Sequence, residues 1–107
     1  MRTLLFTLAL ATVALAQDQG RFTGIVADTT GAVIPGASIK VKNEKTGAER
    51  TVKSSETGVF FVTNLSPATY TIVAASAGLN DAVYKEINLA LGQERTINIV
   101  MQPTSVT

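Results

Sequence analysis

Cysteine, histidine and tryptophan are all missing from this chain of 107 residues. Without cysteine and histidine, neither the usual zinc sites nor the Ser-His-Asp and Cys-His nucleophilic systems can be built. The lack of cysteine also excludes a disulfide, and the lack of tryptophan removes the side chain best suited to stacking on a sugar ring. The composition therefore argues against the common enzyme mechanisms, and we predict a protein that is not an enzyme and has no cofactor.

A surplus of charge of one sign is lacking as well. Nine Lys and Arg residues stand against eight Asp and Glu residues. If a leader containing Arg2 is removed, 9 − 1 = 8 basic residues balance the 8 acidic ones. Because nothing in this balance attracts polyanions, we expect neither nucleic acid nor an anionic membrane surface as a partner.

The first 16 residues resemble a secretory signal peptide. Arg2 supplies a positive end, the stretch from Thr3 to Val13 is almost entirely apolar, and Ala14-Leu15-Ala16 forms a cleavage site before Gln17. The apolar run of about 14 residues is shorter than the roughly 20 that a membrane-spanning helix needs. We therefore predict cleavage and export, with a retained N-terminal anchor as the alternative.

This reading divides the chain into four parts. We predict a signal peptide over residues 1–16, a linker over 17–21, a folded domain over 22–102 and a tail over 103–107. The predicted location is the periplasm, the outer membrane or the extracellular space.

The folded part has the hydrophobic period of β-structure. From Phe22 onward, short β-branched and aromatic runs alternate with polar residues and are separated by turn residues. Seven strands are predicted, over residues 22–28, 37–43, 49–54, 59–63, 69–76, 83–91 and 94–101. The third is mostly polar and is therefore expected at a sheet edge. The fold class predicted is all-β, a small seven-stranded antiparallel β-sandwich.

Alternation along the strands predicts which side chains are buried. In the sixth strand, one face is expected to carry Val83, Lys85, Ile87, Leu89 and Leu91, which leaves Tyr84 on the other. Phe61 is expected to point outward, beside Val73. The predicted core consists of Phe22, Val26, Ile39, Val41, Phe60, Val62, Leu65, Tyr70, Ile72, Ile87, Leu89, Ile97 and Ile99.

The stretch GAVIPGAS, from Gly31 to Ser38, comes close to a nucleotide-binding P-loop. Its two glycines have the right spacing, but Ala37 stands where the motif requires lysine. A P-loop also needs a following helix to hold phosphate, whereas the residues after Ala37 alternate like a strand. We therefore predict no nucleotide binding at this stretch.

The same stretch is readily explained as a connection between strands. Asp28 can accept backbone N–H bonds at the start of the turn, and Gly31 can adopt a positive φ. Pro35 fixes the exit, and Gly36 lets the chain bend into the next strand. Gly58 is expected to serve a second turn in the same way, and Gly92 is expected to form a tight hairpin between the last two strands.

Two segments resemble the carboxypeptidase regulatory-like domain: FTGIVADTTGAVIPGASIKVKNEKTG and TGVFFVTNLSPATYTIVAASAG. The family pattern is matched by Gly24, Val26, Asp28, Gly31, Ile34, Pro35, Gly36, Ala37, Ile39 and Val41, and then by Gly58, Phe60, Val62, Leu65, Pro67, Tyr70 and Ile72. The resemblance implies a prealbumin-like (transthyretin-like) Greek-key sandwich, which is grouped with carbohydrate-binding-like folds. One departure is Ala68, where the family usually has glycine.

The resemblance also implies a role. Similar domains lie at the N-terminus of exported bacterial proteins, often ahead of a TonB-dependent outer-membrane receptor barrel. We therefore expect a structural or protein-interaction module of the cell envelope, whose partner is an envelope protein or a following domain. The alternative is a carbohydrate-binding module, with a polysaccharide as partner and with Phe61 and Tyr84 as stacking residues.

Other candidate sites have simpler explanations. Asp28, Glu56 and Asp81 could be calcium ligands, but EF-hand-like spacing is absent and turn capping is the ordinary role of such residues. Collagen-adhesin B-type domains have a similar sandwich with a Lys–Asn isopeptide bond, and Asn98 could serve in one. The first strand, FTGIVAD, contains no lysine to complete it. No metal is therefore predicted, and the predicted ligand or partner surface is Phe61, Val73 and Tyr84.

Overall fold

The computed structural model describes residues 19–104, so the predicted leader and its cleavage site lie outside the described part. Eight strands and no helix occur between Gln19 and Thr104. The strands are β1 (Gly20–Asp28), β2 (Ser38–Asn43), β3 (Glu49–Lys53), β4 (Val59–Leu65), β5 (Ala68–Ala75), β6 (Ala82–Leu89), β7 (Glu94–Thr96) and β8 (Ile99–Met101). Nothing in this described stretch is a helix long and apolar enough to cross a membrane.

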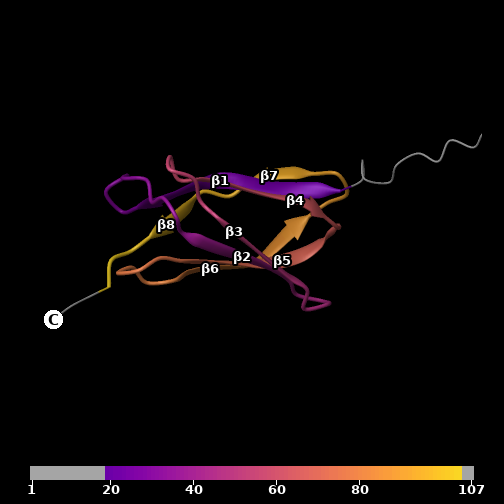
Figure 1. Ribbon diagram of the computed structural model, residues 1–107. Helices are drawn as coiled ribbons and strands as arrows, with labels where there is room; N and C mark the ends of the chain where they lie inside the picture. Colours follow the sequence, from indigo (N-terminus) through magenta and orange to yellow (C-terminus); the bar gives the residue numbers. More distant parts are fainter. Residues whose placement is uncertain (1–18, 105–107) are drawn as a thin grey trace, which may run out of the picture.

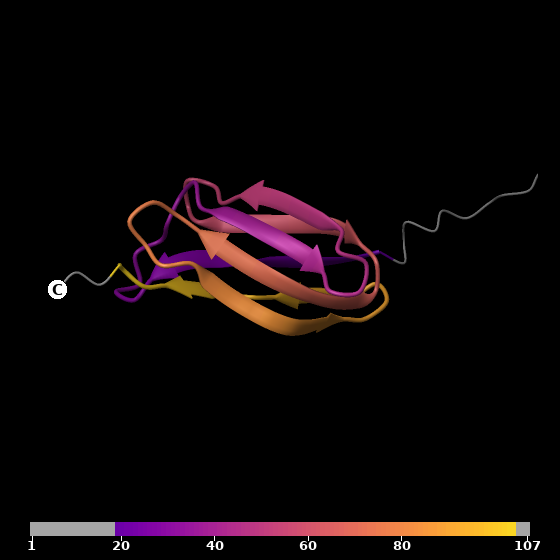
Figure 2. The same ribbon diagram turned by 90° about the horizontal axis from the view of Figure 1, so that it is seen from below.

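The strands form two sheets that pack face to face. One sheet has the order β4-β1-β7, with β8 also paired to β1, and the other has the order β3-β2-β5-β6. Figure 1 shows the two layers from the side, and Figure 2 shows the strands of one layer crossing over those of the other. The predicted all-β sandwich is confirmed, and β3 is at an edge as its polar sequence indicated.

The last predicted strand differs from expectation in two ways. It is divided into β7 and β8, and both pieces pair with β1 in parallel, so the sandwich is not antiparallel throughout. The break falls at Ile97 and Asn98, where the chain comes so close to β1 that a Cβ at Gly24 would lie 1.9 Å from the Ile97 carbonyl oxygen. Gly24 therefore makes this close approach of the two strands possible.

The core lies between the two sheets. Every predicted core residue except Ile87 is buried, and the structure adds Ile34, Ala37, Ala74 and Met101. At its centre the rings of Phe22 and Tyr70 meet edge to face, with centroids 5.6 Å apart. The alternating pattern of each strand thus predicted the core well, because one face of each sheet is buried.

Strand β6 departs from simple alternation. Tyr70 pairs with Ile87 and Ile72 pairs with Tyr84, so one extra residue is accommodated on β6 between these pairs. Glu86 at this bulge has a φ of 58°. The bulge reverses the faces, so Val83 is exposed while Tyr84 and Ile87 pack, half-buried, against the core. The predicted grouping of Val83 with Ile87 and the full burial of Ile87 are therefore wrong.

Candidate functional site

The turn that begins at Asp28 is held by its carboxylate. One Asp28 oxygen accepts hydrogen bonds from the Thr30 backbone N–H (2.8 Å), the Thr30 hydroxyl (2.6 Å) and the Ala32 N–H (3.1 Å). The hydrogen bond from the Thr30 hydroxyl is the main cause that lowers the pKa of Asp28, and the backbone N–H groups act in the same direction. The Asp28 carboxylate therefore caps the start of this turn.

The glycines of the GAVIPGAS stretch serve the backbone. Gly31 has a φ of 92° and Gly36 a φ of 72°, and neither has an atom within 4 Å of where a Cβ would be. After Ala37 the chain continues into β2 and not into a helix. Because a P-loop depends on the N-terminus of a helix, the geometry of this stretch is that of a connection between strands.

Ser54 ties the end of this connection to the second sheet, a role that the sequence did not reveal. Its hydroxyl donates to the Ile34 carbonyl (2.7 Å) and accepts from the Ala37 N–H (2.8 Å), and the side chain is buried. The Gly36 N–H donates to the Ser54 carbonyl (3.0 Å). A serine in a polar edge strand has no distinctive sequence signal, and only the fold brings these groups together.

The predicted surface of Phe61, Val73 and Tyr84 is not a single patch. Phe61 lies on β4 in one sheet, whereas Val73 lies on β5 in the other. Tyr84 packs against the core, and its hydroxyl accepts a hydrogen bond from the Val100 N–H at 3.3 Å. The prediction failed here because the bulge at Glu86 turns Tyr84 inward.

A different surface gathers most of the exposed apolar side chains. Four of the six large hydrophobic side chains that are exposed among the described residues lie on the outer side of the β4-β1-β8 sheet: Ile25, Val33, Phe61 and Val100, each between 43% and 55% exposed. The strand registers place Val33 and Val100 opposite Ala27, Val59 opposite Ile25, and Phe61 opposite Thr23. Since residues paired across strands share a face, these side chains form one surface, which we call the apolar face.

The apolar face carries little charge. At one end of the face, Arg21 and Glu94 face each other across β1 and β7 and form an ion pair of 3.0 Å. The outer side of the other sheet differs, since its apolar cross-strand pair, Val73 and Val83, lies beside Lys40. The two outer surfaces of the sandwich are therefore chemically distinct.

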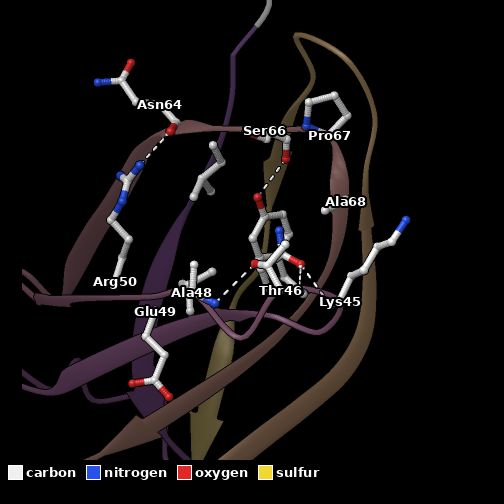
Figure 3. A pocket seen from close by; sticks show the side chains of 13 residues that line it. Lys45, Thr46, Ala48, Glu49, Arg50, Asn64, Ser66, Pro67 and Ala68 are labelled. Atoms are coloured by element: carbon white, nitrogen blue, oxygen red, sulfur yellow. Dashed lines mark hydrogen bonds between the residues drawn. The ribbon is translucent and has the colours of Figure 1, made fainter.

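A hollow of about 400 Å³ lies at one end of the sandwich, between the β2–β3 turn and the β4–β5 connection (Figure 3). Several of its polar side chains form hydrogen bonds within the protein. Arg50 donates to the carbonyls of Thr63 and Asn64, and the Tyr70 hydroxyl donates to the Ser66 carbonyl at 2.7 Å. Burial raises the pKa of Tyr70 and keeps its phenol neutral. These hydrogen bonds brace this corner of the fold.

The remaining carboxylates do not converge on a metal site. Among residues 19–104 there is no group of three His, Cys, Asp or Glu side chains that could hold a metal ion. Glu44 accepts from the Thr71 hydroxyl (2.7 Å) and the Glu86 N–H (2.9 Å), and these two hydrogen bonds lower its pKa. Asn98 is also engaged, because its side-chain oxygen accepts from the Ile25 N–H at 3.3 Å.

The comparison with protein families gives a match over most of the chain. The family model described as the carboxypeptidase regulatory-like domain matches residues 21–102. No curated protein matches the sequence. The family match covers all eight strands except the first residue of β1.

Solved structures with the same fold belong to proteins of different kinds. The Bacillus anthracis TIE protein has a TM-score of 0.67 and 21% identity, over 81% of this chain and 17% of that one. A Bacteroides uniformis protein described as a candidate carbohydrate binding protein has a TM-score of 0.64 and 19% identity, over 78% of this chain and 41% of that one. The 3-chlorocatechol 1,2-dioxygenase of Rhodococcus opacus has a TM-score of 0.63 and 10% identity, over 81% of this chain and 61% of that one. At these identities the likeness extends to the fold alone, and the chain spans less than two thirds of each of these proteins.

Proposed function

Because this chain belongs to the carboxypeptidase regulatory-like domain family, we propose that it is a non-catalytic module of the bacterial cell envelope that works by contact with another protein. The observation that carries this proposal is the apolar face, which gathers Ile25, Phe61 and Val100 on one sheet. Monomeric proteins seldom expose a contiguous apolar surface of this kind without a use for it.

The chemistry of the face defines the partner. Because the exposed side chains that make up the face are hydrophobic, the matching surface is uncharged and apolar, such as the outer side of another β-sheet. Two sheets pack at about 10 Å with interdigitating side chains. An association of this type is insensitive to ionic strength, in contrast to one driven by exposed charges.

The leader-like start of the sequence supports export. The module would then act in the periplasm, at the outer membrane or outside the cell, and one setting that fits is the N-terminal extension of a TonB-dependent outer-membrane receptor. The protein recovered from the envelope fraction should begin at Gln17 when its N-terminal residues are sequenced. Recovery from the cytoplasm with Met1 intact would contradict export.

Retention in the envelope tests the contact itself. After a wash with high salt, the tagged wild-type chain and the Val83→Glu variant should stay with the envelope, because their apolar face is unchanged. The Phe61→Glu variant should be released, since burying an unpaired carboxylate in an apolar contact is unfavourable. If Phe61→Glu and Val83→Glu both have wild-type stability and are retained equally, the proposed contact is wrong.

A carbohydrate-binding role is the second candidate, and a specific observation favours it. Phe61 is 55% exposed and lies on the outer face of its sheet beside Thr23, an arrangement on which a sugar could stack. A glycan array probed with the wild type and with Phe61→Ala separates the two candidates. Binding that the substitution abolishes would favour this second role over protein contact.

A further inference from the structure

The first and last strands of the described chain lie side by side and point the same way. Arg21, Phe22 and Thr23 pair in parallel with residues of β7, and Val26, Ala27 and Asp28 pair in parallel with residues of β8. The chain therefore enters β1 at one end of the sandwich and leaves β8 at the other, as Figure 1 shows. The two ends of the module are separated by about 25 Å along β1, from the rise of a strand per residue.

This arrangement decides how tension between the two ends would act. A pull on Gln19 and Thr104 draws β1 and β8 in opposite directions along their shared axis. The force then acts along the strands, as shear, and all the hydrogen bonds between the strands share it. None of these hydrogen bonds can therefore open before the others. From this geometry we propose that the module is built to carry tension between its ends, with the parallel β1–β7–β8 pairing as its clamp. This inference goes beyond protein contact and does not depend on the apolar face.

Four contacts along the clamp support this role. At the entry, the Arg21 N–H donates to the Gln93 carbonyl at 2.9 Å, and the Arg21 side chain pairs with Glu94. In the middle, the Ile97 N–H donates to the Thr23 carbonyl at 2.8 Å, and the Asn98 side chain accepts from the Ile25 N–H. The break between β7 and β8 is therefore bridged, and the clamp is continuous along β1.

The surroundings of the clamp prevent the strands from slipping. β1 is the central strand of its sheet and is held on its other side by β4. The inward side chains of the clamp, Phe22, Val26, Ile99 and Met101, are fully buried, so sliding by one residue would bring them out of the core. Beyond β8, the Asn80 N–H donates to the Gln102 carbonyl at 2.8 Å and ties the exit to the β5–β6 turn.

The clamp is entirely non-covalent. The chain has no cysteine, and FTGIVAD supplies no lysine for a cross-link to Asn98. Its resistance therefore rests on hydrogen bonds and packing, and the force at which it yields is governed by the rate of unfolding.

Single-molecule pulling on the full chain tests the proposal, and the absence of natural cysteine makes the attachment points unique. One variant carries Gln19→Cys and Thr104→Cys, which loads the clamp in shear. The other carries Thr29→Cys and Thr104→Cys. Because Asp28 pairs with Met101, both of these attachment points lie at the same end of the paired strands, and pulling peels β8 from β1 one residue pair at a time. The unfolding force should be about twofold or more higher in shear, since unfolding then has to break the clamp as a unit. Equal forces in the two geometries would overturn the proposal.

Asn98 allows a second test in the shear geometry. Asn98→Ala should lower the unfolding force because it removes the acceptor of the Ile25 N–H, and Asn98→Asp should restore most of it because it keeps that oxygen. The control is Val52→Ala on β3, outside the clamp, which should lower equilibrium stability with a smaller effect on the force. A larger loss of force with Val52→Ala than with Asn98→Ala would also contradict the clamp.

Discussion

Gly24 is the residue on which the close approach of the last strand to β1 depends. A Cβ at this position would lie 1.9 Å from the Ile97 carbonyl oxygen, which is backbone and cannot rotate away. At Gly31, by contrast, there is open space, and the constraint is the φ of 92°. The two glycines are therefore required for different physical reasons, a close approach and a left-handed backbone.

Substitution separates these reasons. Gly24→Ala should lower the free energy of unfolding by about 3 kcal/mol or prevent folding, because two backbones must move apart. Gly31→Ala should lower it by only about 1 kcal/mol, the cost of a left-handed alanine. Urea unfolding followed by far-UV circular dichroism measures both, and equal losses would show that the Gly24 contact is not tight.

Asp28 provides a residue-scale prediction about pH. Its pKa is lowered in the folded chain, chiefly by the Thr30 hydroxyl, so its contribution to stability is present above the unfolded pKa of about 3.9 and is lost as the pH falls through the folded value. Glu44, whose pKa is also lowered, acts in the same direction. The wild type should therefore lose more stability than Asp28→Asn between about pH 5 and about pH 2. A variant that loses as much as the wild type would show that Asp28 makes no such contribution.

At the scale of elements, β6 contains the feature that sequence reasoning missed most clearly. Strict alternation predicted one face for Val83 and Ile87, whereas the bulge at Glu86 places them on opposite sides. A glutamate at positive φ has no sequence signature, since glycine and asparagine are the residues expected there. The Glu44 carboxylate, which accepts the Glu86 N–H, comes from a turn 42 residues away and could not have been identified from the sequence.

The bulge can be tested by a change that relieves its strain. Glu86→Gly should raise the free energy of unfolding by about 0.5–1 kcal/mol, because glycine adopts positive φ without the steric cost paid by glutamate. Lys85→Gly, one residue earlier in the same strand, should lower it by a similar amount, about 0.5–1 kcal/mol. Loss of stability in both variants, measured by urea unfolding, would contradict the left-handed backbone at Glu86.

The junction between the first connection and β3 depends on Ser54. Ser54→Ala leaves the Ala37 N–H and the Ile34 carbonyl without their buried partner, which should lower the free energy of unfolding by about 1–3 kcal/mol. Ser55→Ala is the matched control, because its hydroxyl lies in an exposed turn and should matter less. If the two substitutions cost the same in thermal or urea unfolding, Ser54 does not hold the junction.

At the scale of the whole molecule, the sandwich could be predicted from the sequence because apolar and polar residues alternate regularly along each strand. Alternation identified the seven runs and nearly all of the core, and Asp28, Gly31 and Gly36 marked the first connection. The direction of the last strand was not accessible, because Gly92 suggests a hairpin while β6 and β7 in fact lie in different sheets. The departure at Ala68 proved harmless, since Ala68 is not among the residues with positive φ and begins β5.

The apolar face is also a property of the whole molecule. Its members come from β1, β4, β8 and the first connection, and only the pairing of these segments makes them neighbours. From the sequence, Phe61 was correctly expected to face outward, but it was grouped with Val73 on the opposite sheet. Hydrophobic side chains on the outer positions of separate strands do not reveal which of them will meet.

Contact through the apolar face can be detected by cross-linking in the intact bacterium. A photo-reactive residue is introduced at Phe61 in one strain and at Val83, on the opposite sheet, in another. We expect a discrete protein adduct from the Phe61 position that disappears when Ile25→Glu is added, and little adduct from the Val83 position. Equal adducts from both positions, or none from Phe61, would contradict contact through the apolar face.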